Sequence, residues 1–198
     1  MEISNIGPIK SLRAPANWKR AAARIAQGSR MDLPVVLLVP EDGKQVEIGI
    51  FYRGRLESEE DGTYFHNLLE QNASTSHAVA LTPGQIKALS KILDLAGFNQ
   101  YSFPSHLSGY NADFHLRTAQ ILVINNRSVL KVDGEFKADL KADAFYGSIF
   151  VDADNRGRKI YEIFLLAADK ETYLRTLPLF KEVTDSIEWQ QLEKTTFF

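Results

Sequence analysis

The sequence has 198 residues, of which 44% are hydrophobic and 24% charged, a composition typical of globular proteins rather than disordered or fibrous ones. It contains no cysteine, which excludes a disulfide, a thiolate nucleophile and a cysteine-based metal site. The 23 basic and 25 acidic side chains leave a formal charge of −2, so we expect no nucleic-acid partner. No apolar run has the length of a membrane span or a secretory signal, and we expect a cytoplasmic protein without a membrane partner.

The first forty residues predict a strand, a helix and a second strand. Ile9 to Ala14 has the pattern of a short strand, which a proline ends. Asn17 is placed to cap a helix from Trp18 to Gln27, which a glycine follows. The β-branched apolar run from Val35 to Val39 lies between two prolines, a pattern typical of a strand covered on both faces.

A hairpin and two helices follow. Glu41 to Lys44 predicts a turn, and Gln45 to Arg53 alternates as its returning strand. Ser58 precedes three acidic residues, which a helix N-terminus favours electrostatically. Thr82, with a proline at the next position and Gln85 three residues on, predicts a capping box at the start of another helix.

The second half of the chain changes to a period of two, which predicts strands. Short polar links at Asn125-Asn126 and Asp133-Gly134 indicate tight turns between antiparallel neighbours. Asp169 caps a last amphipathic helix, which Pro178 is expected to kink or split. The five predicted strands are Ala119 to Ile124, Ser128 to Val132, Glu135 to Asp139, Phe145 to Asp152 and Lys159 to Ala167.

These elements predict an α+β fold in one domain over residues 1–198. The short links indicate a central antiparallel sheet of about six or seven strands. Because the apolar face of such a sheet has to be covered, we expect the amphipathic helices to pack on it.

Several segments together resemble a known group. They are Leu12–Trp18, Phe145–Ile149, Arg158–Ala167, Tyr173, Phe180–Val183 and Ser186–Trp189. In these segments the chain resembles the PsbP-like superfamily, which includes the photosystem II extrinsic subunit and the Ran-binding protein Mog of yeast. The resemblance implies a PsbP-like α+β sandwich and a protein-binding role without chemistry. It carries no functional residue across, because the shared positions are structural, and residues 57–116 have no counterpart.

One loop-like stretch, residues 105–115, gathers histidines, serines, a tyrosine and an aspartate, and loops often carry functional groups. The aromatic rings there offer large contact areas at low entropy cost, which favours protein binding. A histidine beside a hydroxyl also keeps open a small-molecule binding or hydrolytic domain with a pocket around residues 106–115. The candidate binding residues are His106, Tyr110, Asp113, Phe114 and His115.

Metal and cofactor motifs are judged by their ligand positions. Asp152 to Gly157 resembles the opening of a calcium loop, but Arg156 and Ile163 stand where oxygen ligands are required, so a polar hairpin turn is predicted. The four histidines lack helical metal-site spacing, and the glycines form no phosphate-binding loop. We therefore expect no metal and no cofactor.

The sequence favours a non-enzymatic protein-binding domain, for example a bacterial immunity protein or secretion adaptor, whose partner is another protein. A small-molecule or hydrolytic domain is the alternative, and a structural subunit of an oligomer is a third. The C-terminal Phe197 and Phe198 are expected either to pack on the domain or to dock on another chain.

Overall fold

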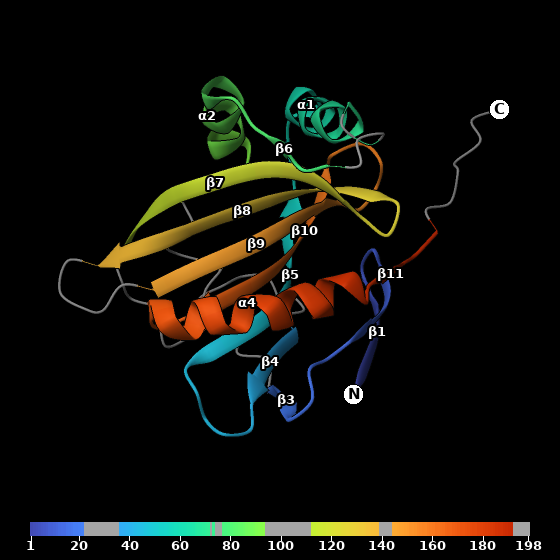
Figure 1. The fold of residues 1–198 in the computed structure, drawn as a ribbon. Helices are drawn as coiled ribbons and strands as arrows, with labels where there is room; N and C mark the ends of the chain where they lie inside the picture. The colour runs from blue at the N-terminus through green and yellow to red at the C-terminus, as the bar shows by residue number, and fades with distance from the viewer. Residues whose placement is uncertain (22–35, 72, 74–76, 94–111, 139–143, 192–198) are drawn as a thin grey trace.

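The strands of the protein form two antiparallel sheets (Figure 1). The computed structural model describes residues 1–21, 36–71, 73, 77–93, 112–138 and 144–191, with 112–114 and 136–138 described by their backbone. The large sheet has the strand order β3-β4-β5-β10-β9-β8-β7-β6 and the small sheet the order β1-β2-β11. The large-sheet strands are β3 (Trp18–Ala21), β4 (Val36–Pro40), β5 (Val46–Arg55), β6 (Val79–Ala80), β7 (Ala112–Ile124), β8 (Arg127–Ala138), β9 (Ala144–Asp152) and β10 (Lys159–Ala167). The small-sheet strands are β1 (Glu2–Ile6), β2 (Ile9–Arg13) and β11 (Glu188–Trp189).

The helices in the described residues are α1 (Glu59–Glu70), α2 (Pro83–Ile92) and α4 (Lys170–Asp185). All three begin where the sequence predicts, because Ser58, Thr82 and Asp169 each accept a hydrogen bond from the amide three residues on. The capping box is complete, with Gln85 accepting from the Thr82 amide at 2.9 Å. The predicted α+β class is confirmed, and the large sheet has eight strands rather than six or seven.

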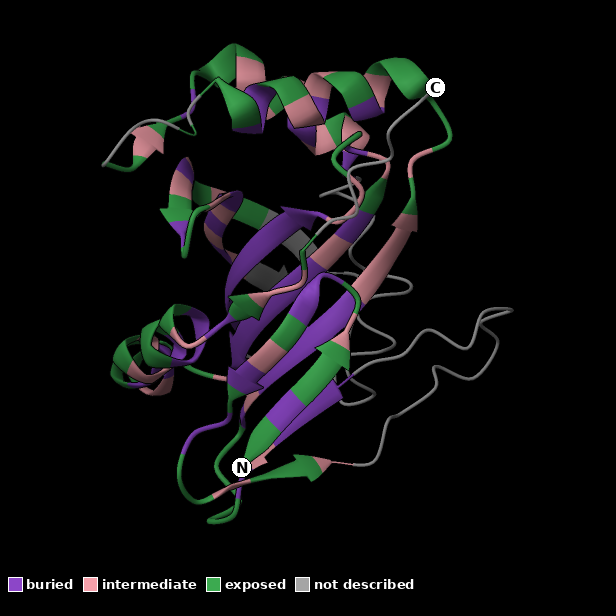
Figure 2. Cartoon of the chain, turned by 90° about the vertical axis from the view of Figure 1, so that its right-hand side faces the viewer, coloured by how far each residue is buried: buried purple, intermediate pink, exposed green. Residues whose placement is uncertain are grey.

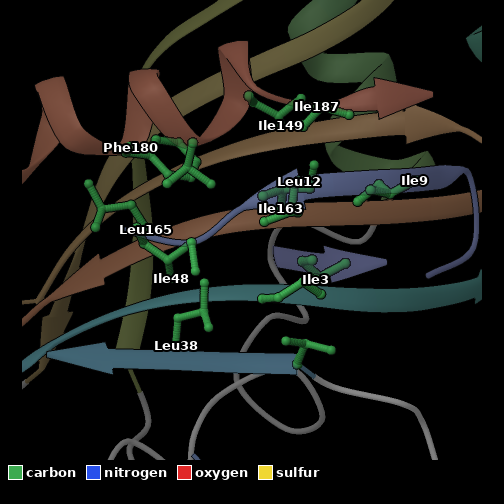
Figure 3. Close-up of a cluster of buried hydrophobic side chains, with 14 of the residues drawn as sticks. Ile3, Ile9, Leu12, Leu38, Ile48, Ile149, Ile163, Leu165, Phe180 and Ile187 are labelled. Carbon is green, nitrogen blue, oxygen red and sulfur yellow. The ribbon is translucent and has the colours of Figure 1, made fainter. Parts of the chain in front are cut away.

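Helices cover the large sheet on both faces, and its middle strands are buried (Figures 1 and 2). On one face α1 and α2 contribute Phe65 and Leu89 to a core that includes Phe150. On the other face α4 and the small sheet pack Phe180 and Leu12 into a second core (Figure 3). Both cores consist of branched aliphatic and aromatic side chains, whose burial is the main favourable term in folding.

Pro178 does not split α4, which runs unbroken from Lys170 to Asp185, so of the two predicted outcomes, a kink or a split, the split is wrong. A proline removes the hydrogen bond to the carbonyl four residues earlier, here that of Leu174. Leu174 is exposed, so this turn of the helix faces solvent. Because Tyr173 and Phe180 on either side of the proline are buried against the sheet, packing holds the helix together across it.

The helix predicted from Trp18 is wrong over Trp18–Ala21, which form β3 on the edge of the large sheet. Asn17 has a φ of 60°, whereas a helix N-cap is extended. Pairing with β4 gives the backbone of β3 its hydrogen-bond partners, and the local sequence does not reveal this pairing. The rest of the predicted helix lies outside the described residues.

The turn predicted at Asp133-Gly134 is also wrong, because both residues lie within β8. Gly134 pairs with Leu116 of β7 on one side and Tyr146 of β9 on the other. Pairing with these two long strands keeps the backbone extended at Asp133-Gly134 instead of allowing a turn. The Asp133 carboxylate accepts a hydrogen bond from the Tyr173 hydroxyl of α4, which explains a polar residue there. Strand β7 correspondingly starts at Ala112, so residues 112–115 lie in a strand rather than a loop.

Candidate functional site

The candidate residues of the sequence are placed only in part. His106 and Tyr110 lie outside the described residues. Asp113 and Phe114 lie in the backbone of β7, and His115 is an exposed residue of the same strand. Their proposed convergence in one pocket therefore stays a prediction, as does the fate of the C-terminal phenylalanines, which also lie outside the described part.

A different cluster lies at the end of the large sheet, where two tight connections meet. The β7–β8 turn consists of Asn125 and Asn126, with φ values of 47° and 66°. Two left-handed residues in succession form the turn that matches strand twist, so the hairpin predicted here is confirmed. The Asn125 side chain donates to the carbonyls of Asp185 at 2.9 Å and Ile187 at 2.7 Å, which fixes the turn to the end of α4.

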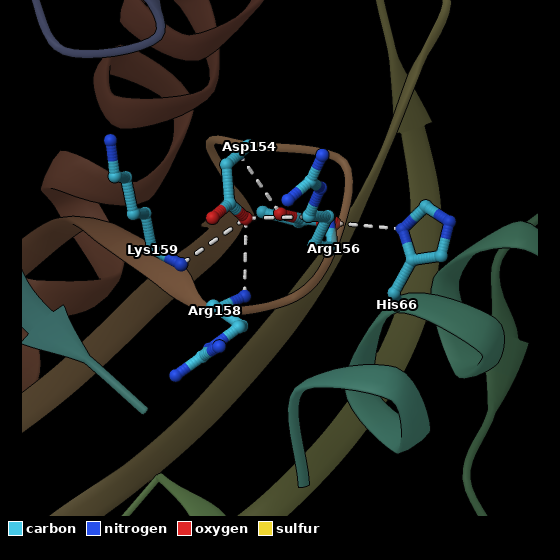
Figure 4. Close-up of polar contacts among 6 residues, drawn as sticks. His66, Asp154, Arg156, Arg158 and Lys159 are labelled. Atoms are coloured by element: carbon cyan, nitrogen blue, oxygen red, sulfur yellow. Dashed lines mark hydrogen bonds and ion pairs between the residues drawn. The ribbon is translucent and has the colours of Figure 1, made fainter. Parts of the chain in front are cut away.

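The β9–β10 connection is the other loop at this end, and Asp154 organises it (Figure 4). One oxygen of its carboxylate accepts from the amides of Arg156 at 3.3 Å, Arg158 at 3.1 Å and Lys159 at 3.3 Å. Although burial alone would raise it, hydrogen bonds from Asp152 and from these amides hold the pKa of Asp154 below its usual value. The motif that resembles a calcium loop is thus a polar hairpin turn, as predicted.

This hairpin packs directly on α1. Gly157 has a φ of 67°, and a Cβ atom built on it would lie 1.9 Å from the carbonyl oxygen of Gly62. The Arg158 guanidinium also donates to Glu59, the first residue of α1, at 2.8 Å. The contact brings α1 close enough that His66 Nδ1 lies 2.8 Å from Asp152 Oδ2 (Figure 4).

A pocket of about 920 Å³ opens between these elements, and we call it the end pocket. Residues from α1, both loops and the segment after α4 contribute to it. Its lining consists of His66, Leu69, Glu70, Ala73, Asn125, Asn126, Arg127, Ser128, Asp152, Asn155, Trp189, Gln190 and Gln191.

Arg127 and Ser128 each bring a buried polar atom without a hydrogen-bond partner among the described residues to the lining of the end pocket. Arg127 Nη1 and Ser128 Oγ are buried, and neither makes a hydrogen bond with the described residues. The Arg127 guanidinium lies over the ring of Trp189, 5.2 Å from its centroid. Trp189 is itself fixed, because its indole N–H donates to the Ile124 carbonyl at 2.7 Å. Folded proteins pair nine-tenths or more of their buried polar groups, so two unpaired neighbours in one pocket call for a physical reason.

Burial is the largest influence on the pKa values of Arg127 and Asp152 in the end pocket. Burial lowers the pKa of Arg127, and the negative charge of Asp152 opposes that change. Burial also raises the pKa of Asp152, which hydrogen bonds from His66 and the Asp154 amide oppose. Asp152 is thus near Arg127 electrostatically, but its oxygens are engaged by His66 and the loop backbone.

The chemistry available here is limited. A histidine oriented by a carboxylate is the arrangement of a general base, and a serine lines the same pocket. However, Ser128 Oγ makes no hydrogen bond with any described residue, and therefore none with His66, so His66 does not activate it as a nucleophile. No group of three potential metal-ligating side chains occurs within the described residues. The arrangement offers hydrogen-bond donors and one positive charge to a ligand.

Sequence reasoning missed this site. His66 was one of four scattered histidines, and Arg127 belonged to no motif. Its one local signal was Asn125-Asn126 followed at once by Arg127 and Ser128, since a tight turn places the next residues at a sheet end. The partners come from far along the chain, with His66 and Asp152 separated by 86 positions.

The fold is similar to that of cyanobacterial PsbP (CyanoP) from Synechocystis sp. PCC 6803, solved in solution. The TM-score is 0.55, and the match covers 96% of this chain and 92% of that chain at 12% sequence identity. No family model and no curated protein matches the sequence. None of the helices in the described residues is long and apolar enough to cross a membrane.

At 12% identity, the likeness defines the architecture alone. The chain therefore has a PsbP-like fold, an α+β sandwich built on a large antiparallel sheet, as the resemblance in its sequence implied.

Proposed function

We propose that the chain is a non-enzymatic protein-binding domain of the PsbP-like superfamily and that the end pocket receives part of its partner. The observation that carries this proposal is the pair of buried, unpaired groups, Arg127 Nη1 and Ser128 Oγ, in a pocket of about 920 Å³. Leaving each group unpaired costs about 1–3 kcal/mol in the folded chain. A partner that supplies the missing hydrogen bonds recovers that free energy on binding.

Binding rather than catalysis is favoured by the same two residues. A nucleophilic serine needs a base within hydrogen-bonding distance, and Ser128 Oγ has none among the described residues. Trp189 and Arg127 are side chains of the kind that contribute most to protein interfaces. A bacterial immunity protein or a secretion adaptor in the cytoplasm is the type of role that fits such a domain.

A second candidate is the binding of a small molecule in the end pocket. The volume of the pocket, about 920 Å³, favours this reading because small-ligand sites occupy about 300–1,000 Å³. The two candidates share the site and differ in what enters it.

The test is a pull-down with the full chain as bait, in wild-type form and as Arg127→Met. Arg175→Met is the matched control, because Arg175 is an exposed arginine of α4 whose loss changes the net charge by the same amount. We expect one protein to be recovered by the wild type and the control and lost with Arg127→Met. Recovery of no specific protein, or equal recovery by Arg127→Met, would contradict the proposal.

A further inference from the structure

The unpaired polar groups of the end pocket define what it can bind. Ser128 is 9% exposed and Arg127 follows the β7–β8 turn, so both are held by the rigid end of the sheet. A hydroxyl donates one hydrogen bond, and a guanidinium donates through N–H groups in its own plane. The ligand group must therefore accept hydrogen bonds, and it must come within reach of a positive charge.

The Trp189 ring helps to position the Arg127 guanidinium, which lies over it. A guanidinium that lies over an aromatic face is attracted by the ring and can still donate hydrogen bonds to a partner. The Trp189 indole is anchored by its hydrogen bond to Ile124, so the ring and the guanidinium over it are arranged before a ligand arrives. Such preorganisation lowers the entropic cost of binding.

The charge of the ligand group follows from the neighbours of Arg127. Asp152 and Glu70 line the same pocket, so a doubly charged phosphate meets more repulsion there than a group with one negative charge. A carboxylate carries one negative charge and presents two oxygens in a plane, the geometry that pairs best with arginine. Asp152 itself is engaged by His66 at 2.8 Å and by the Asp154 amide at 3.1 Å.

We infer that the end pocket binds a carboxylate group through Arg127 and Ser128. This inference rests on the proposed function and names the group that a partner inserts. The same chemistry is offered by an acidic side chain or chain end of a protein and by a free small carboxylate. The rest of the pocket is lined by the amide side chains of Asn126, Gln190 and Gln191, which suit a polar ligand body.

The experiment is an NMR titration of the full chain that follows the indole N–H signal of Trp189, assigned by comparison with Trp18→Phe. The probes are sodium glutarate, neutral glutaramide, inorganic phosphate, and the blocked tripeptide Ac-Ala-Glu-Ala-NH₂ with its glutamine counterpart. We expect glutarate and the glutamate peptide to shift the signal and their neutral counterparts to leave it unchanged.

Arg127→Met should weaken glutarate binding at least about 10-fold and Ser128→Ala about 3-fold, because a charged hydrogen bond contributes more than a neutral one. Arg175→Met should bind as the wild type.

Three results would overturn the inference: equal binding of glutaramide, tighter binding of phosphate than of glutarate, or unchanged glutarate binding by Arg127→Met. None of them affects the proposed function, which depends on recovery of a protein partner. Tighter binding of the glutamate peptide than of glutarate supports a protein source of the carboxylate. The reverse order keeps the carboxylate inference and counts against the protein partner.

Discussion

Arg53 and Arg127 both lie in strands of the large sheet and are withdrawn from water, but they differ in what surrounds their guanidinium groups. The Arg53 side chain is 12% exposed, lies 3.6 Å from the Glu162 carboxylate and donates to the Leu93 carbonyl at 2.9 Å. Glu162 in turn accepts from the Ser148 hydroxyl at 2.7 Å. The Arg127 guanidinium instead lies over the Trp189 ring, and its buried Nη1 makes no hydrogen bond within the described part of the chain.

The difference separates a structural arginine from a binding one. A buried charge whose partners are complete stabilises one arrangement of the chain, and removing a partner leaves an uncompensated charge. A buried donor without a hydrogen-bond partner lowers the stability of the folded chain, because its desolvation is not compensated. Substitution by methionine should therefore lower the free energy of unfolding at Arg53 but not at Arg127.

The largest effect is expected for Arg53→Met. It leaves the buried Glu162 without a positive neighbour, which should lower the free energy of unfolding by about 3–5 kcal/mol at pH 8. The loss should shrink at pH 5, where Glu162 is protonated in the folded state. Urea unfolding at both pH values measures this, with Arg175→Met as the control for loss of an exposed arginine. An equal loss at both pH values would show that Glu162 is not the affected group.

The stability of the protein is expected to depend on pH through Glu162, the buried partner of Arg53. Burial raises the pKa of Glu162 to about 7, against an ordinary 4.5, although Arg53 opposes this. The folded chain therefore binds this proton more tightly than the unfolded chain, so the contribution of Glu162 to stability is largest below pH 4.5 and falls as the pH rises to 7. The fall contributed by this group is roughly 3 kcal/mol at most.

Glu162→Gln should remove that part of the fall between pH 5 and pH 8, while its amide oxygen still accepts from Ser148. Part of the slope should remain, because burial also raises the pKa of Asp152. Urea unfolding across this range measures the slope, and Glu60→Gln, an exposed site on α1, is the control. A slope identical in the wild type and Glu162→Gln would exclude the assignment.

The contact that builds the end pocket is expected to give an intermediate effect. Gly157→Ala forces a left-handed φ on alanine and places its Cβ atom 1.9 Å from the Gly62 carbonyl oxygen, so we expect a loss of about 2 kcal/mol or more. Gly43 has a φ of 75° with nothing within 4 Å of a built Cβ, so Gly43→Ala carries the backbone cost alone, about 1 kcal/mol. Thermal unfolding of both variants isolates the steric part. Equal losses would mean that the hairpin does not pack against α1 as described.

The parts of the fold that could be predicted from the sequence depend on neighbours in the chain. The caps at Ser58, Thr82 and Asp169 and the turn at Asn125-Asn126 are local, because each needs hydrogen bonds or φ values within a few residues. Strand β3 could not be predicted, since its pairing with β4 decides it over the local helical pattern. Asp133-Gly134 has the composition of a turn, but long neighbouring strands and Tyr173 hold it extended.

The candidate site was less predictable for the same reason. Arg127 Nη1 and Ser128 Oγ are distinguished by the absence of a hydrogen-bond partner among the described residues, and a sequence pattern does not reveal a missing hydrogen bond. Trp189 is 65 positions from the carbonyl that anchors it. The predicted group around residues 106–115 rests on residue types alone, and its convergence stays a prediction. The single-domain organisation also stays a prediction.

The most direct test is the equilibrium urea unfolding of Arg127→Met. If Arg127 serves binding and not stability, its loss should not destabilise the fold. Methionine keeps an apolar contact with Trp189 and removes an unpaired buried N–H, so we expect the free energy of unfolding to change by less than about 1 kcal/mol or to rise. A loss of about 3 kcal/mol, comparable to that expected for Arg53→Met, would contradict the account and make Arg127 a structural residue.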